Sequence, residues 1–75
     1  MTKYKHDNVI QAQYTIKGVT YTVYYTNDTR CFGGSAWVVY TNKGGQRLYP
    51  SSMPPEQAIR EWSQGLPPRT KKVGY

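Results

Sequence analysis

Hydrophobic and polar residues alternate on both sides of Lys17 and Gly18, which predicts two antiparallel strands joined by a tight turn. A two-residue turn at these positions fixes the register of the whole hairpin. On one face the predicted pairs are mainly apolar: Ile16/Val19, Tyr14/Tyr21, Ala12/Val23 and Ile10/Tyr25. On the other face they are mainly polar: Thr15/Thr20, Gln13/Thr22, Gln11/Tyr24 and Val9/Thr26. The first third of the chain is therefore expected to form a hairpin with one apolar and one polar face.

Two further strands are expected after a polar, glycine-ended loop at residues 27–34. Residues 36–40 are rich in aromatic and β-branched side chains, and residues 46–49 follow a glycine turn. We expect Ala36, Val38 and Tyr40 to join the apolar face of the hairpin, because small and aliphatic groups are then inside. The face of Leu48 stays open, since turns of three and of four residues place it on opposite sides relative to Tyr40.

A short amphipathic helix is expected to begin at Pro54 and Pro55, with Ser51 or Ser52 as the candidate cap, and to stop at Gly65. Its apolar stripe follows helical spacing: Pro55, Ala58, Ile59 and Trp62. We expect Trp62 to anchor the core, because so small a domain needs large apolar area.

The elements together predict an α+β fold: an antiparallel three- to four-stranded β-meander packed against one C-terminal α-helix, in the order β-β-β-β-α. Residues 1–66 are expected to form a single domain. Residues 67–75 carry cations without a hydrophobic pattern and are expected to form a flexible basic tail.

The composition argues against an enzyme or a metal protein. A chain of 75 residues leaves little room for an enclosed active site, and its carboxylate, histidine and thiol groups are few: four Asp or Glu, His6 and Cys31. One Cys and one His do not complete a zinc site, and no phosphate-binding loop is present in the sequence. We therefore expect no catalytic residues, no metal and no cofactor.

Cys31 is the single cysteine, so no disulfide can form within the chain. A secreted protein of this size usually needs such bridges, and we therefore expect a cytoplasmic location. The longest apolar stretch, residues 36–40, is far shorter than a membrane span, so no membrane association is expected.

Charge is the feature that suggests a partner. Ten Lys and Arg against four Asp and Glu give a net charge of +6, and the helix itself is nearly neutral. The basic residues of the strands, loops and tail therefore lie beside the aromatic residues of the strands, a combination that suits nucleic acid. We expect a nucleic-acid partner, DNA more than RNA, with these contact residues: Tyr24, Arg30, Trp37, Lys43, Arg47, Tyr49, Arg69, Lys71 and Lys72.

Within this expected interface four residues are assigned to the sheet face away from the helix: Tyr24, Trp37, Arg47 and Tyr49. The basic tail is assigned to phosphates. The segments at residues 37–40, 43–45, 47–49 and 55–58 resemble the small sheet-plus-helix DNA-binding domains of the plant AP2 type and the arm-binding domains of tyrosine integrases. The resemblance covers about half the chain. We expect the three-stranded sheet to lie against duplex DNA in the major groove, as it does in other proteins that read DNA with a β-sheet.

Three alternatives stay open at this point. The same aromatic residues would also serve as a stacking platform for single-stranded DNA or RNA. The same mixture of aromatic residues and arginine is typical of protein interfaces, which would suit a small phage-like inhibitor or regulator that docks on an acidic host protein. An exposed edge strand at residues 46–49 would instead suit a structural part of a larger particle. The sequence decides neither the partner, nor any base preference, nor the oligomeric state.

Overall fold

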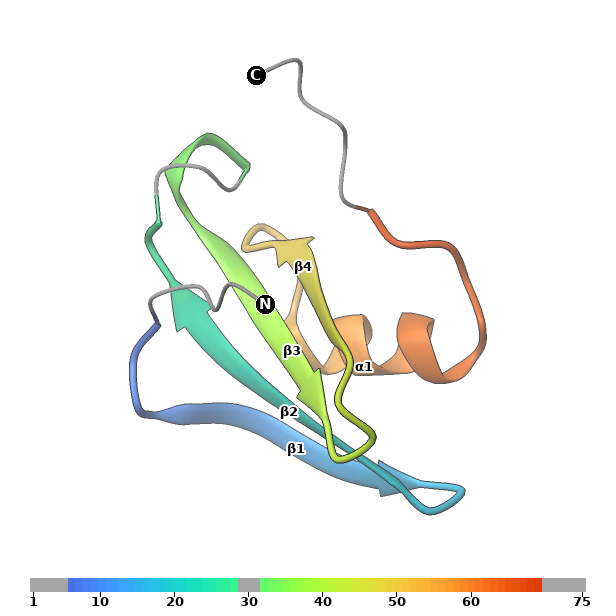
Figure 1. The fold of residues 1–75 in the computed structure, drawn as a ribbon. Coiled ribbons are helices and arrows are strands. Elements are labelled where there is room, and N and C mark those ends of the chain that lie inside the picture. Colours follow the sequence, from blue (N-terminus) through green and yellow to red (C-terminus); the bar gives the residue numbers. More distant parts are fainter. Residues whose placement is uncertain (1–5, 29–31, 70–75) are drawn as a thin grey trace.

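The computed structural model describes residues 6–28 and 32–69. It confirms the α+β class and the β-β-β-β-α order (Figure 1). The elements are β1 (Ile10–Ile16), β2 (Val19–Thr26), a short 3₁₀ turn (Phe32–Gly34), β3 (Ala36–Thr41), β4 (Gln46–Pro50) and α1 (Pro55–Ser63). Within the described residues no helix is long and apolar enough to span a membrane.

The hairpin of β1 and β2 confirms the predicted turn and most of the predicted register. Lys17 and Gly18 have φ angles of 52° and 81°, the left-handed pair that a type I′ turn requires. Pairing follows the prediction from Ile16 with Val19 back to Ala12 with Val23. The expected pairings of Ile10 with Tyr25 and of Gln11 with Tyr24 are wrong, because a β-bulge shifts Ile10 opposite Tyr24 and leaves an extra residue in β1.

The four strands form one antiparallel meander in the order β1-β2-β3-β4. Leu48 pairs with Val38, and directly paired residues share a face of the sheet, so Leu48 lies on the same face as Val38. The structure thereby decides the face of Leu48, which the length of the turn did not determine.

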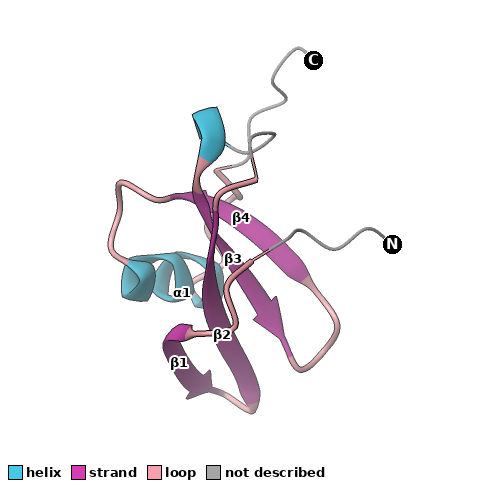
Figure 2. Ribbon diagram, turned by 90° about the vertical axis from the view of Figure 1, so that its left-hand side faces the viewer, coloured by secondary structure: helices cyan, strands magenta, loops and turns pink. Residues whose placement is uncertain are grey.

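Helix α1 covers one face of this sheet and leaves the other without a helix (Figure 2). The core between the sheet and the helix consists of the buried residues Tyr21, Val23, Val39, Tyr49, Ala58 and Ile59. Half-buried Trp37 and Trp62 pack against it, so the expected core role of Trp62 is confirmed.

The expectation for β3 is wrong. Trp37 and Val39 face the helix, whereas Ala36, Val38 and Tyr40 face the opposite side. The physical reason is the register with β2, which pairs Val39 with Val23 and therefore places both side chains in the same core. This phase also brings the larger apolar area of Trp37 under the helix.

A smaller apolar cluster lies on the sheet face that has no helix. It contains Ala36, Val38 and Leu48, with Phe32 and Tyr40 packed against them. The face is therefore partly apolar around β3 and β4, and its polar part lies over β2 and β1.

Backbone conformation and backbone hydrogen bonds, rather than a side-chain cap, define the two ends of helix α1. Pro54 is the N-cap residue without a side-chain cap bond, so the expected serine cap is wrong; the Ser51 hydroxyl instead lies 2.8 Å from the Ser35 hydroxyl. At the other end Gly65, with φ 77°, donates its N–H to Trp62, and the next N–H reaches Glu61. This is a Schellman motif, and it confirms the predicted stop at Gly65.

Candidate nucleic-acid interface

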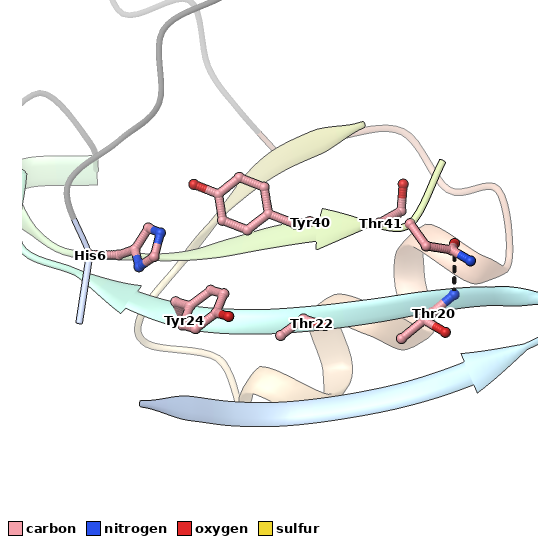
Figure 3. A pocket seen from close by; sticks show the side chains of 7 residues that line it. His6, Thr20, Thr22, Tyr24, Tyr40 and Thr41 are labelled. Atoms are coloured by element: carbon pink, nitrogen blue, oxygen red, sulfur yellow. Dashed lines mark hydrogen bonds between the residues drawn. The ribbon is translucent and has the colours of Figure 1, made fainter. Parts of the chain in front are cut away.

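The helix-free face carries a hollow of about 370 Å³ over β2 and β3 (Figure 3). Its lining combines aromatic rings with hydroxyl and amide groups: His6, Thr20, Thr22, Tyr24, Tyr40, Thr41 and Asn42. Alternation along β2 turns Thr20, Thr22 and Tyr24 to this side, while its apolar residues enter the core. Of the described residues that line the hollow, none is acidic.

Three aromatic rings gather at one end of the hollow. The His6 ring stacks on Tyr24 with a centroid distance of 4.3 Å and an interplanar angle of 19°. Tyr40 meets both rings edge-on, at 5.5 Å from His6 and 5.9 Å from Tyr24. A backbone bond from Asp7 N–H to the Tyr25 carbonyl, 2.9 Å, holds the segment of His6 beside β2. The stack shows that the face of Tyr24 accepts a planar heteroaromatic ring.

Hydrogen bonds order the polar part of this face. The Thr20 N–H donates to Asn42 Oδ1 at 3.1 Å (Figure 3). The Asn42 N–H in turn donates to the Thr20 carbonyl at 3.2 Å. These two bonds tie the ends of the two hairpins together. Exposed Lys17 and Lys43 lie in the turns of those hairpins, so both lysines belong to the same end of the sheet.

Most of the described residues that the sequence assigned to the interface lie elsewhere. Tyr24 lies on the expected face, but Trp37 and Tyr49 pack on the helix side, so their predicted place was wrong. The indole Nε1 of Trp37 donates to the Met53 carbonyl at 2.6 Å. Both errors have one cause: the residues of β3 face the opposite side of the sheet from the one expected. Tyr49 of β4 pairs with Trp37 and therefore lies on the same face as Trp37.

Arg47 also faces the helix rather than the opposite side. Its guanidinium lies 4.6 Å from the centroid of the Trp62 ring, and its Nη1 donates to the Leu66 carbonyl at 3.2 Å and the Tyr49 hydroxyl at 3.3 Å. These contacts give Arg47 a structural role in joining β4 to the end of the helix.

Arg69 forms an ion pair with the helix. Its Nε and Nη2 donate to the two carboxylate oxygens of Glu61 at 2.8 and 2.6 Å, a bidentate geometry, and Gln57 adds a third bond at 3.1 Å. The hydrogen bonds from Arg69 and then Gln57 lower the pKa of Glu61 from its usual 4.5 to about 2. Glu61 itself is buried, so this ion pair joins the segment after the helix to a buried carboxylate.

Of the other basic residues that were expected to contact nucleic acid, one lies in the turn between β3 and β4 and three lie outside the described residues. Lys43 is exposed beside the hollow's Asn42. Arg30, Lys71 and Lys72 lie outside the described residues, as does most of the expected basic tail at 67–75. All four acids but only five of the ten Lys and Arg lie within residues 6–28 and 32–69.

Four residues that line the hollow were not expected from the sequence: His6, Tyr40, Thr41 and Asn42. The polar pairs of the first hairpin already indicated Thr20, Thr22 and Tyr24, because they alternate with core residues. No pattern in the neighbouring sequence predicts that His6 stacks on Tyr24, because this contact depends on where the segment before β1 lies in the fold. Tyr40 was assigned to the other face for the reason given above.

The chemistry available here is stacking and hydrogen bonding. Within the described part of the chain no three His, Cys, Asp or Glu side chains come together to hold a metal ion. No family model matches this chain, and no curated protein or solved structure is significantly similar to it.

Proposed function

We propose that this protein binds nucleic acid through the helix-free face of its sheet, with an unpaired base against the aromatic rings of the hollow. The observation that supports this most directly is the parallel stack of His6 on Tyr24. A nucleobase is also a planar heteroaromatic ring, and stacking of a base on an aromatic side chain contributes about 1–3 kcal/mol.

The hydroxyl and amide groups of the hollow suit the polar edge of a base. Thr22 and Asn42 line the same hollow as the rings, and both side-chain types donate and accept hydrogen bonds. His6 and Tyr24 line the hollow together with these polar groups. The site therefore offers one apolar and one polar contact to the same ligand.

The distribution of charge supports a phosphate backbone along this face. Lys43 is adjacent in sequence to Asn42 of the hollow, and Lys17 lies in the neighbouring hairpin turn. Of the acids, Glu56 and Glu61 lie on the helix, across the sheet, and Asp7 follows His6. The net charge of +6 favours encounter with any polyanion.

The arrangement favours single strands over a duplex. In a duplex the bases present only their edges in the grooves, and reading them requires projecting side chains such as arginine. Arg47 and Arg69 are engaged with Trp62 and Glu61, while Trp37 packs beside the core. An unpaired base instead presents the ring face that an aromatic hollow accepts.

The test compares two adjacent tyrosines on opposite faces. Fluorescence anisotropy with labelled single-stranded DNA, single-stranded RNA and duplex DNA gives the affinity of wild type, Tyr24→Leu and the matched control Tyr25→Leu. Tyr24→Leu is expected to weaken single-strand binding by about 1–3 kcal/mol. Tyr25→Leu is expected to leave it unchanged, because the Tyr25 ring contacts Trp37 on the helix side.

A salt titration adds the phosphate contribution. The double variant Lys17→Ala with Lys43→Ala is expected to reduce the slope of log affinity against log salt by up to about 1.4 for single strands. Absence of binding to every oligonucleotide below about 50 mM salt would refute the proposal and favour an acidic protein as partner. Stronger binding to duplex than to single strands would refute the role given to the hollow.

A further inference from the structure

The outer strand β1 and the residue before it carry most of the large hydrophobic side chains that are exposed among the described residues. In the described chain, four large hydrophobic side chains are exposed, and three of them lie in or beside β1: Val9, Ile10 and Tyr14, with exposed fractions of 61%, 49% and 49%. The residues from 8 to 16 contain no charged residue and no proline. Exposed edge strands usually carry one of these protections against pairing.

The other edge strand, β4, provides an internal comparison. It contains Arg47 and Pro50, and its apolar residues Leu48 and Tyr49 are buried. Charge and proline are common devices for blocking an edge. Within the described residues the two edges of the sheet therefore differ, and β1 is the edge left open to pairing, with a bulge only at its first residues.

The backbone of β1 has its free hydrogen-bonding groups at defined positions. A type I′ turn makes Ile16 and Val19 a hydrogen-bonded pair, and such pairs alternate along an antiparallel ladder. Gln13 and Thr15 consequently direct their N–H and C=O groups away from β2, toward the open edge. The regular segment from Ala12 to Ile16 is long enough for one short antiparallel pairing.

A groove of about 320 Å³ accompanies this edge on the helix side. It is lined by Tyr14, Ile16, Glu56, Ile59, Arg60 and Ser63. Its apolar part comes from the strand and Ile59, and its charged part consists of one acid and one base, one helical turn apart. A surface of this kind is complementary to a second copy of itself that runs in the opposite direction.

We propose that β1 pairs antiparallel with β1 of a second copy of this chain, about a two-fold axis at Tyr14. In this register the two Tyr14 rings meet on the helix side, and Ala12 of each copy faces Ile16 of the other. On the opposite side Gln13 faces Thr15, and these two residues exchange backbone hydrogen bonds. Apolar residues thus pair with apolar residues and polar residues with polar ones.

The two-fold axis also determines the electrostatics and the position of the hollows. It runs the two α1 helices antiparallel, so Glu56 of one copy faces the Arg60 end of the other. The result is a continuous eight-stranded sheet with both helices on one side and both helix-free faces on the other. Binding of nucleic acid is not required for this pairing, so the two proposals can fail separately.

The first test is the mass of the full-length chain in solution, measured by sedimentation equilibrium from about 1 μM to about 1 mM. A dimer of 8.6 kDa chains is expected. Gln13→Lys places a charge on the open edge and is expected to weaken the dimer at least about tenfold, because it introduces charge into the new ladder. The same change at the other edge, Gln46→Lys, is the matched control and is expected to leave the mass unchanged.

A charge exchange tests the two-fold register. Glu56→Arg alone brings like charges together and is expected to weaken the dimer, whereas Glu56→Arg with Arg60→Glu is expected to restore it. Hydrogen exchange should show protection of the Gln13 and Thr15 amides in wild type that is lost in Gln13→Lys, with circular dichroism as the check of folding. A monomer at every concentration, or a dimer that Gln13→Lys leaves intact, would overturn the proposal.

Discussion

Trp37 is the residue for which the structure most changes the expected effect of a mutation. On the face away from the helix, its loss would weaken binding and leave the fold intact. In the structure it packs against the core, contacts Tyr25 edge-on at 5.7 Å, and donates to the Met53 carbonyl at 2.6 Å. We therefore predict that Trp37→Ala acts on stability.

The magnitude follows from these contacts. Truncation of a core tryptophan to alanine costs about 3–5 kcal/mol, and the half-buried position of Trp37 favours the lower end, about 3 kcal/mol. Trp37→Phe keeps an aromatic ring but loses the donor to Met53, which costs about 1–2 kcal/mol. A domain of this size has a total stability of about 4–11 kcal/mol. Trp37→Ala is thus expected to leave a marginal fold, and Trp37→Phe a stable one.

Thermal melting followed by far-ultraviolet circular dichroism measures the effect. Each 1 kcal/mol lowers Tm by about 4–8 °C in a domain of this size, so Trp37→Ala is expected to lower it by more than about 12 °C. Leu66→Ala, a truncation at an exposed position, is the control and is expected to change Tm by at most about 4 °C. A Trp37→Ala variant that melts within about 4 °C of wild type would refute the place of Trp37 in the core.

Two further predictions concern the turn and the ion pair. Gly18→Val is expected to lower the free energy of unfolding by about 1–2 kcal/mol. The loss comes from backbone strain alone, because φ is 81° at Gly18 and no atom lies within 4 Å of an added Cβ. Urea unfolding should show a smaller loss for Gly18→Asn, and equal losses for the two variants would contradict this explanation. The lowered pKa of Glu61 means that its pairing with Arg69 stabilises the fold above about pH 4.5 and that this contribution is lost as the pH falls toward about 2. Urea midpoints measured between pH 7 and pH 2 should show a part of the acid destabilisation that Glu61→Gln lacks, and parallel curves for the two proteins would contradict it.

The local parts of this fold could be predicted from the sequence. The type I′ turn and the pairs from Ile16/Val19 to Ala12/Val23 follow from alternation on two adjacent segments, because neighbouring strands need no distant information to find their register. The helix limits follow in the same way from Pro54 and Gly65, which act on the backbone directly.

Only part of the candidate site could be predicted from the sequence. Tyr24 could be assigned from the alternation of β2, and it is the one predicted aromatic contact that lies on the helix-free face. His6 and Tyr40 complete the hollow from two other segments, and their meeting depends on the arrangement of the whole sheet. Arg47 and Arg69 were expected to contact nucleic acid. In the structure the Arg47 guanidinium lies over the Trp62 ring. Arg69 forms an ion pair with Glu61.

The sequence by itself determined which residues alternate on each strand, where the first hairpin turns and where the helix starts and stops. Only the tertiary structure decided which side of β3 the helix covers, and therefore that Trp37 packs beside the core while Tyr40 lines the hollow. The physical reason is that a period of two assigns residues to two faces without naming the buried one. The register between β2 and β3 and the packing of α1 make that choice, and both depend on contacts distant in sequence.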